Sequence, residues 1–507
     1  MDPLDSIESI ESIEALNDET NDSVEVSDED IYNMMDPLDS IESISSDEDI
    51  YNLTEESDED VGSSINSSDE VNKYSIVVSY RDADISSDDD SSCDNCIPDD
   101  EYDIENLRNE LYGICSNCNE FNTTYGWCQS CDPKKLTEGW TSENIAIDEF
   151  IKTTQLESKS YTDTFLECIP FYRFENVQKI DQGGLSSVYS ALWLDGERQQ
   201  KEIDGEWKNV RSQPIKVALK TLPTSKDTTE DFLKELQVYY ENSDRSHHFL
   251  KVYGITYDQN LKVYMMVIEY SDYGDLRKYL KTNFFNLKWK SKIELLSEIT
   301  NNLFYIHKHT NFFHGNFHTG NILQSKDSRL KIADFGFVQS FKKFNKSDKG
   351  IYGILPYISP EVLNGQEYSQ AADIYSFGMI MFEIATGRPP FNNHPHNIEL
   401  ALKICEGLRP ECGEGVPECY VQLVNRCLDS NAEKRPTIDE IWNIILNWDK
   451  SCNWKIAYLD EERLKIRKEF EEADKLIPKL AATSYPDSHP ETVWTSCHLY
   501  FPDLADQ

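Results

Sequence analysis

The sequence has few basic residues and no long apolar run. Of its 507 residues, 48 are Lys or Arg and 93 are Asp or Glu, which gives a net charge of −45. Residues 1–105 contain 36 acidic and only two basic residues, so this region alone carries −34. It would repel nucleic acid and anionic lipid, and we expect neither as a partner. No stretch reaches the ~18 apolar residues that a spanning helix requires.

The expected state of the cysteines depends on whether the protein lies in a reducing or an oxidising compartment. Residues 1–5 lack the basic start and the apolar stretch of a secretory signal, so we expect a reducing compartment, cytoplasmic or nuclear. In such a compartment the 13 cysteines are expected to be zinc ligands or core thiols and not disulfides.

Residues 1–105 form a low-complexity acidic region with an internal duplication. The string MDPLDSIESI occurs at 1–10 and 35–44, and SDEDIYN occurs at 27–33 and 46–52. High charge with few apolar residues cannot offset the entropy lost on ordering, so the region is predicted to be disordered. Its serines before acidic residues suit an acid-directed kinase. The simpler interpretation is a solvating tail without a regulated site.

Residues 106–135 contain two matching cysteine pairs, YGICSNC and YGWCQSC, in a C-x₂-C-x₉-C-x₂-C arrangement. The four cysteines are Cys115, Cys118, Cys128 and Cys131. Two such turns can surround one Zn²⁺ at ~2.3 Å, and four thiolates leave no open position, so the ion would be structural. Free reduced thiols are one alternative, and a site that uses Cys93 and Cys96 is another. The later pairs match each other and close the shorter loop, which favours them.

Two helices are expected on either side of a central domain at 172–448. Residues 141–157, within a lead-in at 141–171, have an amphipathic pattern that Thr141 or Ser142 could cap. The apolar side of this helix is Ile145, Ile147, Phe150 and Ile151. The C-terminal region 449–507 has a second apolar stripe of Leu459, Ile466, Phe470, Ala473 and Ile477, which ends at Pro478. We expect both helices to pack against the central domain.

The central domain contains motifs in a definite order. KIDQGGLSSV at 179–188 is a glycine-containing turn, and in such turns backbone N–H groups can approach phosphates. The string 217–220, VALK, reads as a buried strand that ends in an ammonium group, Lys220. Glu235 follows fifteen residues later at the start of a helix, and a buried lysine needs such a partner to keep its charge. MMVIEY follows at 265–270.

Polar and acidic motifs follow in the second half of the domain. HGNFHTGN occupies 314–321, and Asp334-Phe335-Gly336 begins thirteen residues after Asn321. Ser359-Pro360-Glu361 and Arg435 complete the series.

Together these motifs resemble the protein-kinase superfamily, and EYxxxGxL after Ile268 resembles its tyrosine-kinase-like group. The layout with an acidic head and a cysteine knuckle resembles the expanded kinase-like families of fungi, especially glomeromycetes. The resemblance implies that Mg²⁺ is held by Asn321 and Asp334, and that the catalytic positions are Asn316, Lys220, Glu235 and Asp334. It implies that ATP contacts Gly183, Val188, Ala218, Lys220, Ile268, Glu269, Ser271 and Asn321.

The sequence departs from the kinase pattern mainly on the substrate side. Asn316 replaces the catalytic Asp, and a neutral amide can orient a hydroxyl but is not a useful base. His318 stands where Ser/Thr kinases have a lysine and is a substitute base if its pKa is near neutrality. The other departures are Asp181 and Ser186 for two loop glycines, Gly315 for an arginine, and Ile354 for a threonine.

The sequence therefore predicts an α+β protein: a two-lobed protein-kinase-like fold preceded by a small zinc knuckle and a disordered acidic N-terminal region. The leading hypothesis is an ATP-binding signalling protein with weak or absent phosphotransfer to protein hydroxyls, similar to a pseudokinase. One alternative is an active Ser/Thr or dual-specificity kinase. The other is an interaction scaffold that works through its acidic region and knuckle. The expected cofactors are ATP, Mg²⁺ and structural Zn²⁺, and the expected partner is a protein substrate or signalling protein.

Overall fold

The computed structural model describes residues 111–183, 186–204, 206–221, 228–242, 248–310, 312–325, 329–335, 351–453, 455–456, 459–477 and 488–499. Contacts divide the chain into two units, Met1–Cys96 and Ile97–Gln507, and all described residues belong to the second. The predicted disorder of residues 1–105 and the alternative zinc pair, Cys93 with Cys96, therefore lie outside the described residues.

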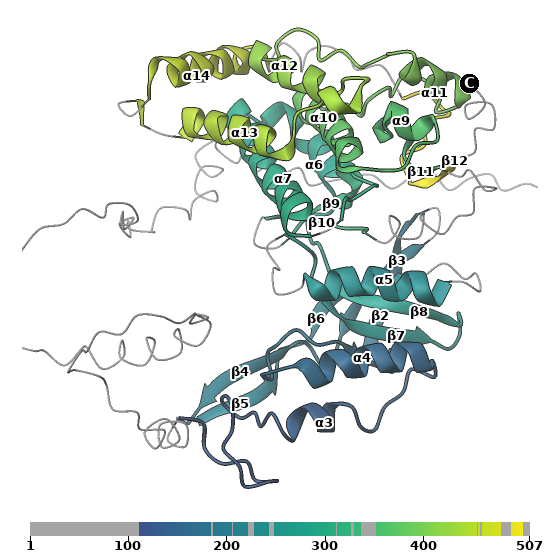
Figure 1. Ribbon diagram of the computed structural model, residues 1–507, viewed down its shortest axis with the longest axis vertical. Coiled ribbons are helices and arrows are strands. Elements are labelled where there is room, and N and C mark those ends of the chain that lie inside the picture. Colours follow the sequence, from purple (N-terminus) through teal and green to yellow (C-terminus); the bar gives the residue numbers. More distant parts are fainter. Residues whose placement is uncertain are drawn as a thin grey trace, which may run out of the picture. The chain divides into compact units, whose positions relative to one another are not determined.

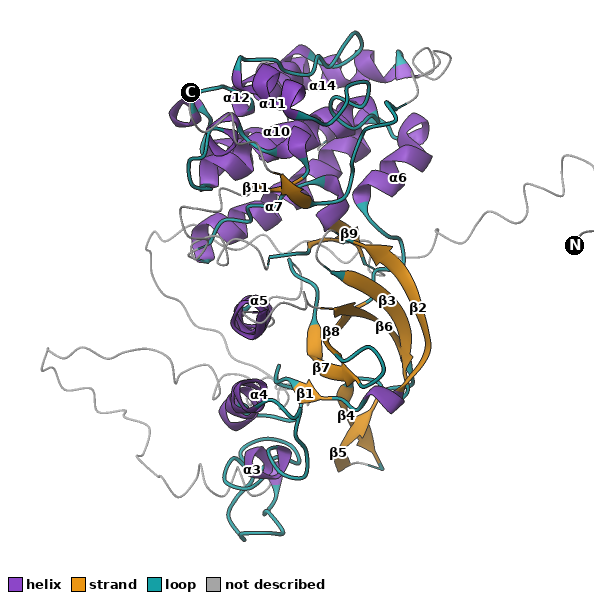
Figure 2. Cartoon of the chain, turned by 90° about the vertical axis from the view of Figure 1, so that its right-hand side faces the viewer, coloured by secondary structure: helices purple, strands orange, loops and turns teal. Residues whose placement is uncertain are grey.

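A six-stranded sheet with the order β1-β7-β8-β6-β3-β2 forms one part of the fold (Figure 2). Its strands are β1 (Glu167–Cys168), β2 (Phe174–Gln182), β3 (Ser187–Trp193), β6 (Ile215–Thr221), β7 (Val252–Asp258) and β8 (Val263–Glu269). β1 pairs in parallel with β7, and the remaining neighbours are antiparallel. A separate antiparallel hairpin consists of β4 (Arg198–Ile203) and β5 (Glu206–Arg211).

The central strand β6 is buried on both faces. Val217 and Leu219 belong to one apolar cluster, together with Trp193 of β3. Successive side chains alternate along a strand, so Ala218 and Lys220 face the other way. That second face is covered by α5 (Thr228–Glu241), with α4 (Ile145–Glu157) beside α5 (Figure 1). One face of β6 thus contributes to an apolar core, and the opposite face carries Lys220.

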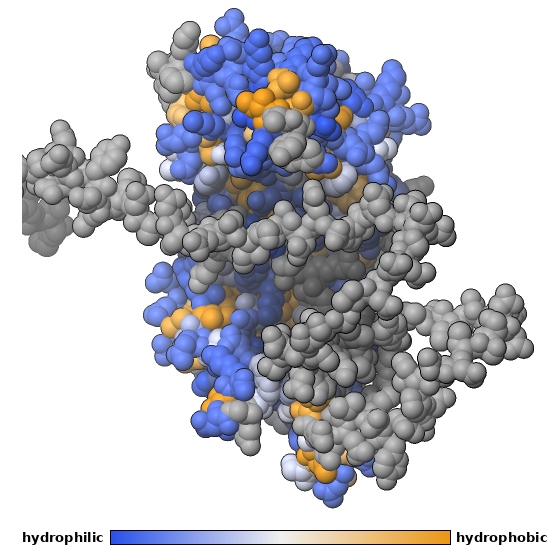
Figure 3. Space-filling model, turned by 90° about the vertical axis from the view of Figure 1, so that its left-hand side faces the viewer, coloured by the Kyte–Doolittle hydropathy of each residue, from blue (hydrophilic) through white to orange (hydrophobic). Residues whose placement is uncertain are grey.

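Helices form the second part of the fold. They are α6 (Leu276–Asn283), α7 (Trp289–His309), α9 (Pro360–Leu363), α10 (Gln370–Thr386), α11 (Ile398–Cys405), α12 (Glu418–Cys427), α13 (Ile438–Asn453) and α14 (Glu461–Asp474). On the face in Figure 3 the upper, helical region is mainly hydrophilic with separate small apolar patches. Among the described helices, none combines the length and the apolar character needed to cross a membrane.

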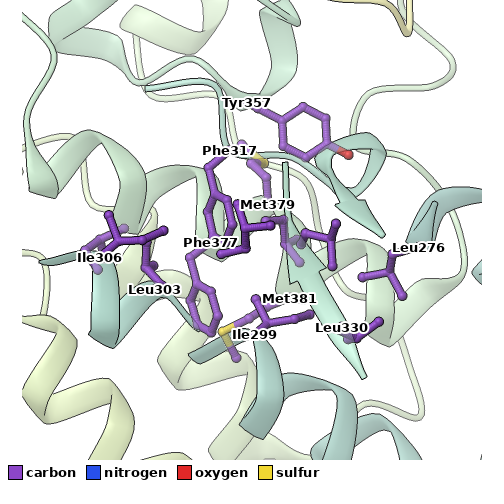
Figure 4. Packing of buried hydrophobic residues seen from close by; sticks show 14 of the residues in the cluster. Leu276, Ile299, Leu303, Ile306, Phe317, Leu330, Tyr357, Phe377, Met379 and Met381 are labelled. Atoms are coloured by element: carbon purple, nitrogen blue, oxygen red, sulfur yellow. The ribbon is translucent and has the colours of Figure 1, made fainter. Parts of the chain in front are cut away.

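Helix α10 is the centre of the helical core. Its side chains are buried from Ala372 to Thr386, because the helix is apolar around most of its circumference. Figure 4 shows Phe377, Met379 and Met381 of this helix packed near Leu303 and Ile306 of α7. At Gly378 of α10, a Cβ atom would come within 2.8 Å of Leu428, so glycine allows the close approach of the segment after α12.

Two short strand pairs position the polar residues of the second half. β9 (Ile322–Gln324) and β10 (Leu330–Ile332) are antiparallel, with Ile322 opposite Ile332. Asn321 immediately precedes β9 and Asp334 lies two residues beyond β10, so the hairpin brings both to the same end. β11 (Ile351–Gly353) pairs with β12 (Cys497–Leu499) near the C-terminus. The sequence did not predict this second pair.

The two flanking helices are present, with two corrections that both concern α4. In α4, Ile147 and Ile151 are buried, but Ile145 is 78% exposed because it is the first residue of the helix. The cap is Asn144, which accepts from the N–H groups of Ala146 and Ile147. Neither predicted cap serves, because the hydroxyls of Thr141 and Ser142 donate to Asp148.

The predicted stripe in the C-terminal region packs against the core. Phe470, Ala473 and Ile477 are buried in the main apolar cluster, and Ile466 lies at its edge. Phe470 contacts the ring of Trp289 on α7, at a centroid distance of 5.7 Å. The predicted α+β fold with two parts is confirmed.

Candidate functional site

A buried cluster of three charged side chains joins the sheet to the helical part. The Lys220 Nζ atom lies 2.6 Å from Glu235 Oε1 on α5 and 2.5 Å from Asp334 Oδ1 after β10. The exposed fraction of each side chain is 9% for Lys220, 9% for Glu235 and 19% for Asp334. The structure thus brings together three of the four predicted catalytic residues.

The charges of this cluster depend on one another. Burial acts to lower the pKa of Lys220, but Asp334 and Glu235 outweigh it, so the pKa lies well above its ordinary value. Burial acts to raise the pKa of Asp334, but Lys220 holds it below the usual range. Burial raises the pKa of Glu235, and Lys220 offsets this only in part. Lys220 is therefore the cation that keeps two buried carboxylates in this position.

Three of the predicted ATP-contacting residues line one region of the sheet. Strand register places Val188 opposite Lys220, and Ala218 opposite Ile268. Ala218 and Ile268 are each 6% exposed. Apolar side chains from three adjacent strands therefore lie next to the cationic side chain, which is the pairing that a flat base with a charged phosphate chain requires.

The end of β8 and the segment after it are held by polar contacts. The Glu269 N–H donates to the Lys251 carbonyl oxygen at 2.8 Å, and Lys331 Nζ contacts both carboxylate oxygens of Glu269 at 2.7 and 2.8 Å. The Glu269 N–H and side chain are thus engaged within the protein. The Ser271 hydroxyl donates to the Gln324 carbonyl oxygen, which ties this segment to β9.

The glycine-containing turn connects β2 to β3. The Gly183 N–H donates to the Ser186 carbonyl oxygen at 2.8 Å, which closes a tight hairpin. A Cβ atom at Gly183 would meet that oxygen at 3.5 Å, an ordinary contact, so the turn itself does not require glycine there. Residues 184–185 lie outside the described residues, as does Gly336 of the Asp-Phe-Gly motif.

Asn316 is hydrogen-bonded to the charged cluster. Its Nδ2 donates to Asp334 Oδ2 at 2.9 Å, and its own carbonyl oxygen accepts from Asn321 Nδ2 at 2.9 Å. The amide nitrogen of Asn321 is used in this contact, so its amide oxygen is the atom that remains for a metal. One carboxylate and one amide oxygen are a hard donor set that fits Mg²⁺.

The loop that carries Asn316 is anchored to α10. Asp373 accepts from the His314 N–H at 2.7 Å and from the Gly315 N–H at 2.8 Å, and it contacts His307 Nε2 at 2.9 Å. Gly315 has φ 71°, a conformation that glycine adopts without strain. Glycine at this arginine position is thus compatible with the loop conformation.

A second buried ion pair, between Glu361 and Arg435, lies in the helical part. Arg435 Nη1 and Nη2 each lie 2.7 Å from a carboxylate oxygen of Glu361, and the Arg435 side chain is fully buried. Ile354, the residue in place of a threonine, is buried at 2% exposure. The Glu361–Arg435 pair joins α9 to the segment before α13.

His318 does not meet the condition for a substitute base, which is a pKa near neutrality. His318 is only 4% exposed, and burial, with Arg277 as the next cause, holds its pKa well below the ordinary value. The side chain is therefore a poor proton acceptor near pH 7. Its Nε2 atom instead contacts Ser496 Oγ at 3.0 Å.

Sequence reasoning missed Ser496. Its Oγ atom lies 3.0 Å from Asn316 Oδ1, so a serine near the C-terminus reaches the loop of the predicted catalytic position. The only available signal was the run of β-branched and aromatic residues from Thr492 onward, which indicates a strand but not its partner.

The four cysteines of the knuckle converge. Their Sγ atoms all lie within 4.8 Å of one another, and Cys118 and Cys128 are 3.6 Å apart. Tetrahedral zinc with Zn–S bonds of ~2.3 Å requires S–S separations of roughly 3.8 Å, so the cluster fits a four-thiolate metal site. Gly113 and Gly126 precede the two pairs at φ 70° and 60°, which lets both turns face inward.

The knuckle is attached to the β4–β5 hairpin and to the end of α4. Trp127 is 1% exposed and lies against Phe165, with a ring-centroid distance of 6.5 Å. Asn209 Nδ2 of β5 donates to the Gly126 carbonyl oxygen at 2.9 Å, and Gln129 Nε2 donates to the Ser158 carbonyl oxygen at 2.8 Å. A metal held by the four cysteines would thus stabilise a part that is docked on the kinase-like region.

Comparison with known proteins agrees with this geometry. The family model described as protein tyrosine and serine/threonine kinase matches residues 174–445, which is more than half of the chain. A probable serine/threonine-protein kinase of Dictyostelium discoideum is 29% identical over 281 residues, covering 55% of this chain and 16% of the relative. Stress-activated protein kinase alpha of the same organism is 28% identical over 283 residues, covering 53% and 40%.

The matched region is thus less than half of the length of either relative. The family match covers the sheet except β1, the charged cluster around Lys220 and the loop of Asn316. The chain belongs to the protein tyrosine and serine/threonine kinase family.

Proposed function

We propose that the protein binds Mg·ATP and transfers phosphate to protein hydroxyls only weakly, as a pseudokinase-like member of the tyrosine-kinase-like group. Its motif pattern, similar to that of fungal kinase-like families, supports the subgroup. The serine/threonine kinases among its relatives support Ser and Thr as the acceptor class. Zn²⁺ in the knuckle and a cytoplasmic location are parts of the same proposal, which is supported by the described cysteines because none of them forms a disulfide.

Nucleotide binding is supported by the cluster around Lys220. A buried ammonium between Glu235 and Asp334 is poised to exchange part of its contact with Asp334 for phosphate oxygens. Asp334 and Asn321 supply oxygens for Mg²⁺, which bridges phosphates to the protein in kinases. The apolar residues Ala218 and Ile268 supply the surface for the base.

The observation that carries impaired transfer is the environment of Asn316. The Asn316 amide donates to the Asp334 carboxylate at 2.9 Å. An aspartate in place of Asn316 would instead put a second carboxylate at this distance from Asp334. Asn316 thus stabilises the Asp334 carboxylate without a metal, and it has no basic atom to accept the proton of an incoming hydroxyl. Loss of a general base costs about 10²–10⁴ in rate.

An active kinase is the second candidate, and one observation favours it. Asn316 Oδ1 accepts a hydrogen bond from a serine hydroxyl, so the amide can still orient an acceptor. Phosphoryl transfer is largely dissociative, and positioning supplies much of its catalysis. A non-catalytic scaffold is the remaining alternative.

Thermal melts with and without millimolar Mg·ATP test the nucleotide-binding part. Ligand at a hundredfold excess over Kd stabilises the folded state by about 2.7 kcal/mol, which raises the melting temperature by several degrees. Lys220→Met should remove most of this shift. Lys201→Met on the exposed β4–β5 hairpin is the matched control and should retain it. A wild-type melt that is indifferent to Mg·ATP would leave the scaffold alternative.

A further inference from the structure

The residues 488–499, here called the tail segment, lie across the loop of Asn316. The segment ends in β12, which pairs antiparallel with β11. Gly353 is opposite Cys497, and Ile351 is opposite Leu499. Main-chain pairing of this kind is a general way in which proteins bind an extended peptide, with side-chain pockets adding specificity. β11 directly precedes Ile354, so the paired strand begins next to the predicted substrate side.

The hydrogen bonds of Ser496 form an ordered chain. His318 Nδ1 accepts from the Gly320 N–H at 3.1 Å, so the proton of the neutral ring is on Nε2, which donates to Ser496 Oγ at 3.0 Å. The Ser496 hydroxyl therefore donates to Asn316 Oδ1, also at 3.0 Å. Asn316 Nδ2 in turn donates to Asp334. Each polar atom in this series of hydrogen bonds is thus assigned as a donor or an acceptor, and the Ser496 hydroxyl points at Asn316, the residue in the catalytic position.

Side chains also hold the segment on the N-terminal side of Ser496. Arg277 Nη1 donates to the Trp494 carbonyl oxygen at 3.0 Å, and its guanidinium lies 5.1 Å from the centroid of the indole ring. The His396 ring meets the same indole edge to face at 4.7 Å. The main-chain N–H of Val493 donates to the ring atom His396 Nδ1 at 3.1 Å. The main-chain N–H of His396 donates to the Glu491 carbonyl oxygen at 3.2 Å. The contacts thus extend over the whole segment and are not confined to one residue.

We propose that β11, the loop 314–318 and Arg277 form the peptide-acceptor groove, and that the tail segment occupies this groove in cis as a pseudosubstrate with Ser496 at the acceptor position. The partner that the groove takes when the tail segment leaves is an extended peptide with a serine or threonine hydroxyl. The inference rests on the proposed function only in treating Asn316 as the residue that faces the acceptor. Occupancy of the groove requires no turnover.

Competition follows from the covalent link between groove and tail segment. A tethered segment has an effective concentration of about 1 mM. If the free peptide binds with a Kd of about 10–100 μM, the intact chain should bind an added peptide roughly 10–100-fold more weakly than a chain whose tail segment is absent. The tail segment therefore limits access by other proteins.

Fluorescence anisotropy with a labelled peptide of sequence 488–499 tests the proposal. The probe is titrated with the full chain and with a variant that lacks 488–507, and the shortened chain should bind at least tenfold more tightly. Ser496→Ala in the peptide should weaken binding roughly tenfold, because two hydrogen bonds are lost. Thr495→Ala is the matched control, since Thr495 is exposed, and its affinity should stay within twofold.

A full-length variant covers the case in which the shortened chain does not fold. Ser496→Glu places a carboxylate against Asn316 Oδ1 and near Asp334, so the tail segment should leave the groove and the variant should bind the probe as tightly as the shortened chain. Equal affinity of the full chain and both variants, or no binding by either variant, would overturn the proposal. Peptide binding by the variants with melts that ignore Mg·ATP would support the groove and refute the proposed nucleotide binding.

Discussion

Removing the ammonium of Lys220 should destabilise the protein even without nucleotide. Lys220→Met leaves two carboxylates, those of Glu235 and Asp334, without the cation that lies 2.6 and 2.5 Å from them. Loss of one partner of a buried ion pair costs about 3–5 kcal/mol. Urea unfolding followed by circular dichroism should therefore show a decrease of this size in the free energy of unfolding.

A double-mutant cycle separates this effect from general damage to the core. Glu235→Gln removes a carboxylate at almost constant volume, so the double variant Lys220→Met/Glu235→Gln contains one fewer uncompensated charge than Lys220→Met. The double variant should be about 1–3 kcal/mol more stable than the sum of the two single effects implies. Part of the loss remains, because Asp334 still lacks its cation.

The pH dependence provides an independent check with a definite sign. Burial raises the pKa of Glu235 in the folded protein, and loss of Lys220 raises it further. Because the raised pKa favours the protonated folded form, the contribution of Glu235 to the free energy of unfolding is fully present below its unfolded pKa of ~4.3. That contribution is lost as pH rises through the pKa of the folded form. Lys220→Met should therefore lose more stability relative to wild type at pH 8 than at pH 5. Additive single effects, or a pH-independent difference, would refute this view of the cluster.

Three further predictions concern the knuckle, the helical core and His318. Replacing Cys128 and Cys131 together by Ser should remove about one zinc ion per chain in elemental analysis of the full chain, and unchanged zinc content would contradict the proposed ligands. Glu361→Gln should lower the free energy of unfolding by about 3 kcal/mol, because the fully buried Arg435 side chain loses its carboxylate partner. ATP affinity should stay within twofold. Unaltered stability would contradict the importance of this ion pair. Because burial holds the pKa of His318 well below its ordinary value, phosphotransfer should show no step near pH 6.5, and a step that His318→Gln abolishes would show that the side chain titrates there.

The sequence predicted the parts of the site that depend on local order. Lys220 and Glu235 lie on a strand and the following helix, and the predicted pair is present at 2.6 Å. Asn321 and Asp334 flank a short hairpin, so their spacing along the chain determines that they lie at the same end. The four cysteines converge because each pair sits on its own tight turn.

Other features depend on contacts that one sequence does not contain. The register of the three-residue strand β12 is set by its pairing with β11, far away in the chain, and no periodicity indicates that partner. The cap of α4 is Asn144 because Asp148 engages the two hydroxyls that the sequence offered as caps. The pKa of His318 follows from burial beneath the tail segment and beside Arg277, and a motif alignment carries no burial.

The central claim, that Asn316 limits phosphotransfer, is tested most directly by comparing wild type with Asn316→Asp on a generic serine peptide with Mg·ATP. Both forms are assayed as the full chain and without 488–507, so that the tail segment does not conceal a difference. Restoring the base should raise the rate a hundredfold or more, because a general base contributes about 10²–10⁴. A wild-type rate already in the usual range of ~1–100 s⁻¹, with no gain from Asn316→Asp, would contradict the claim.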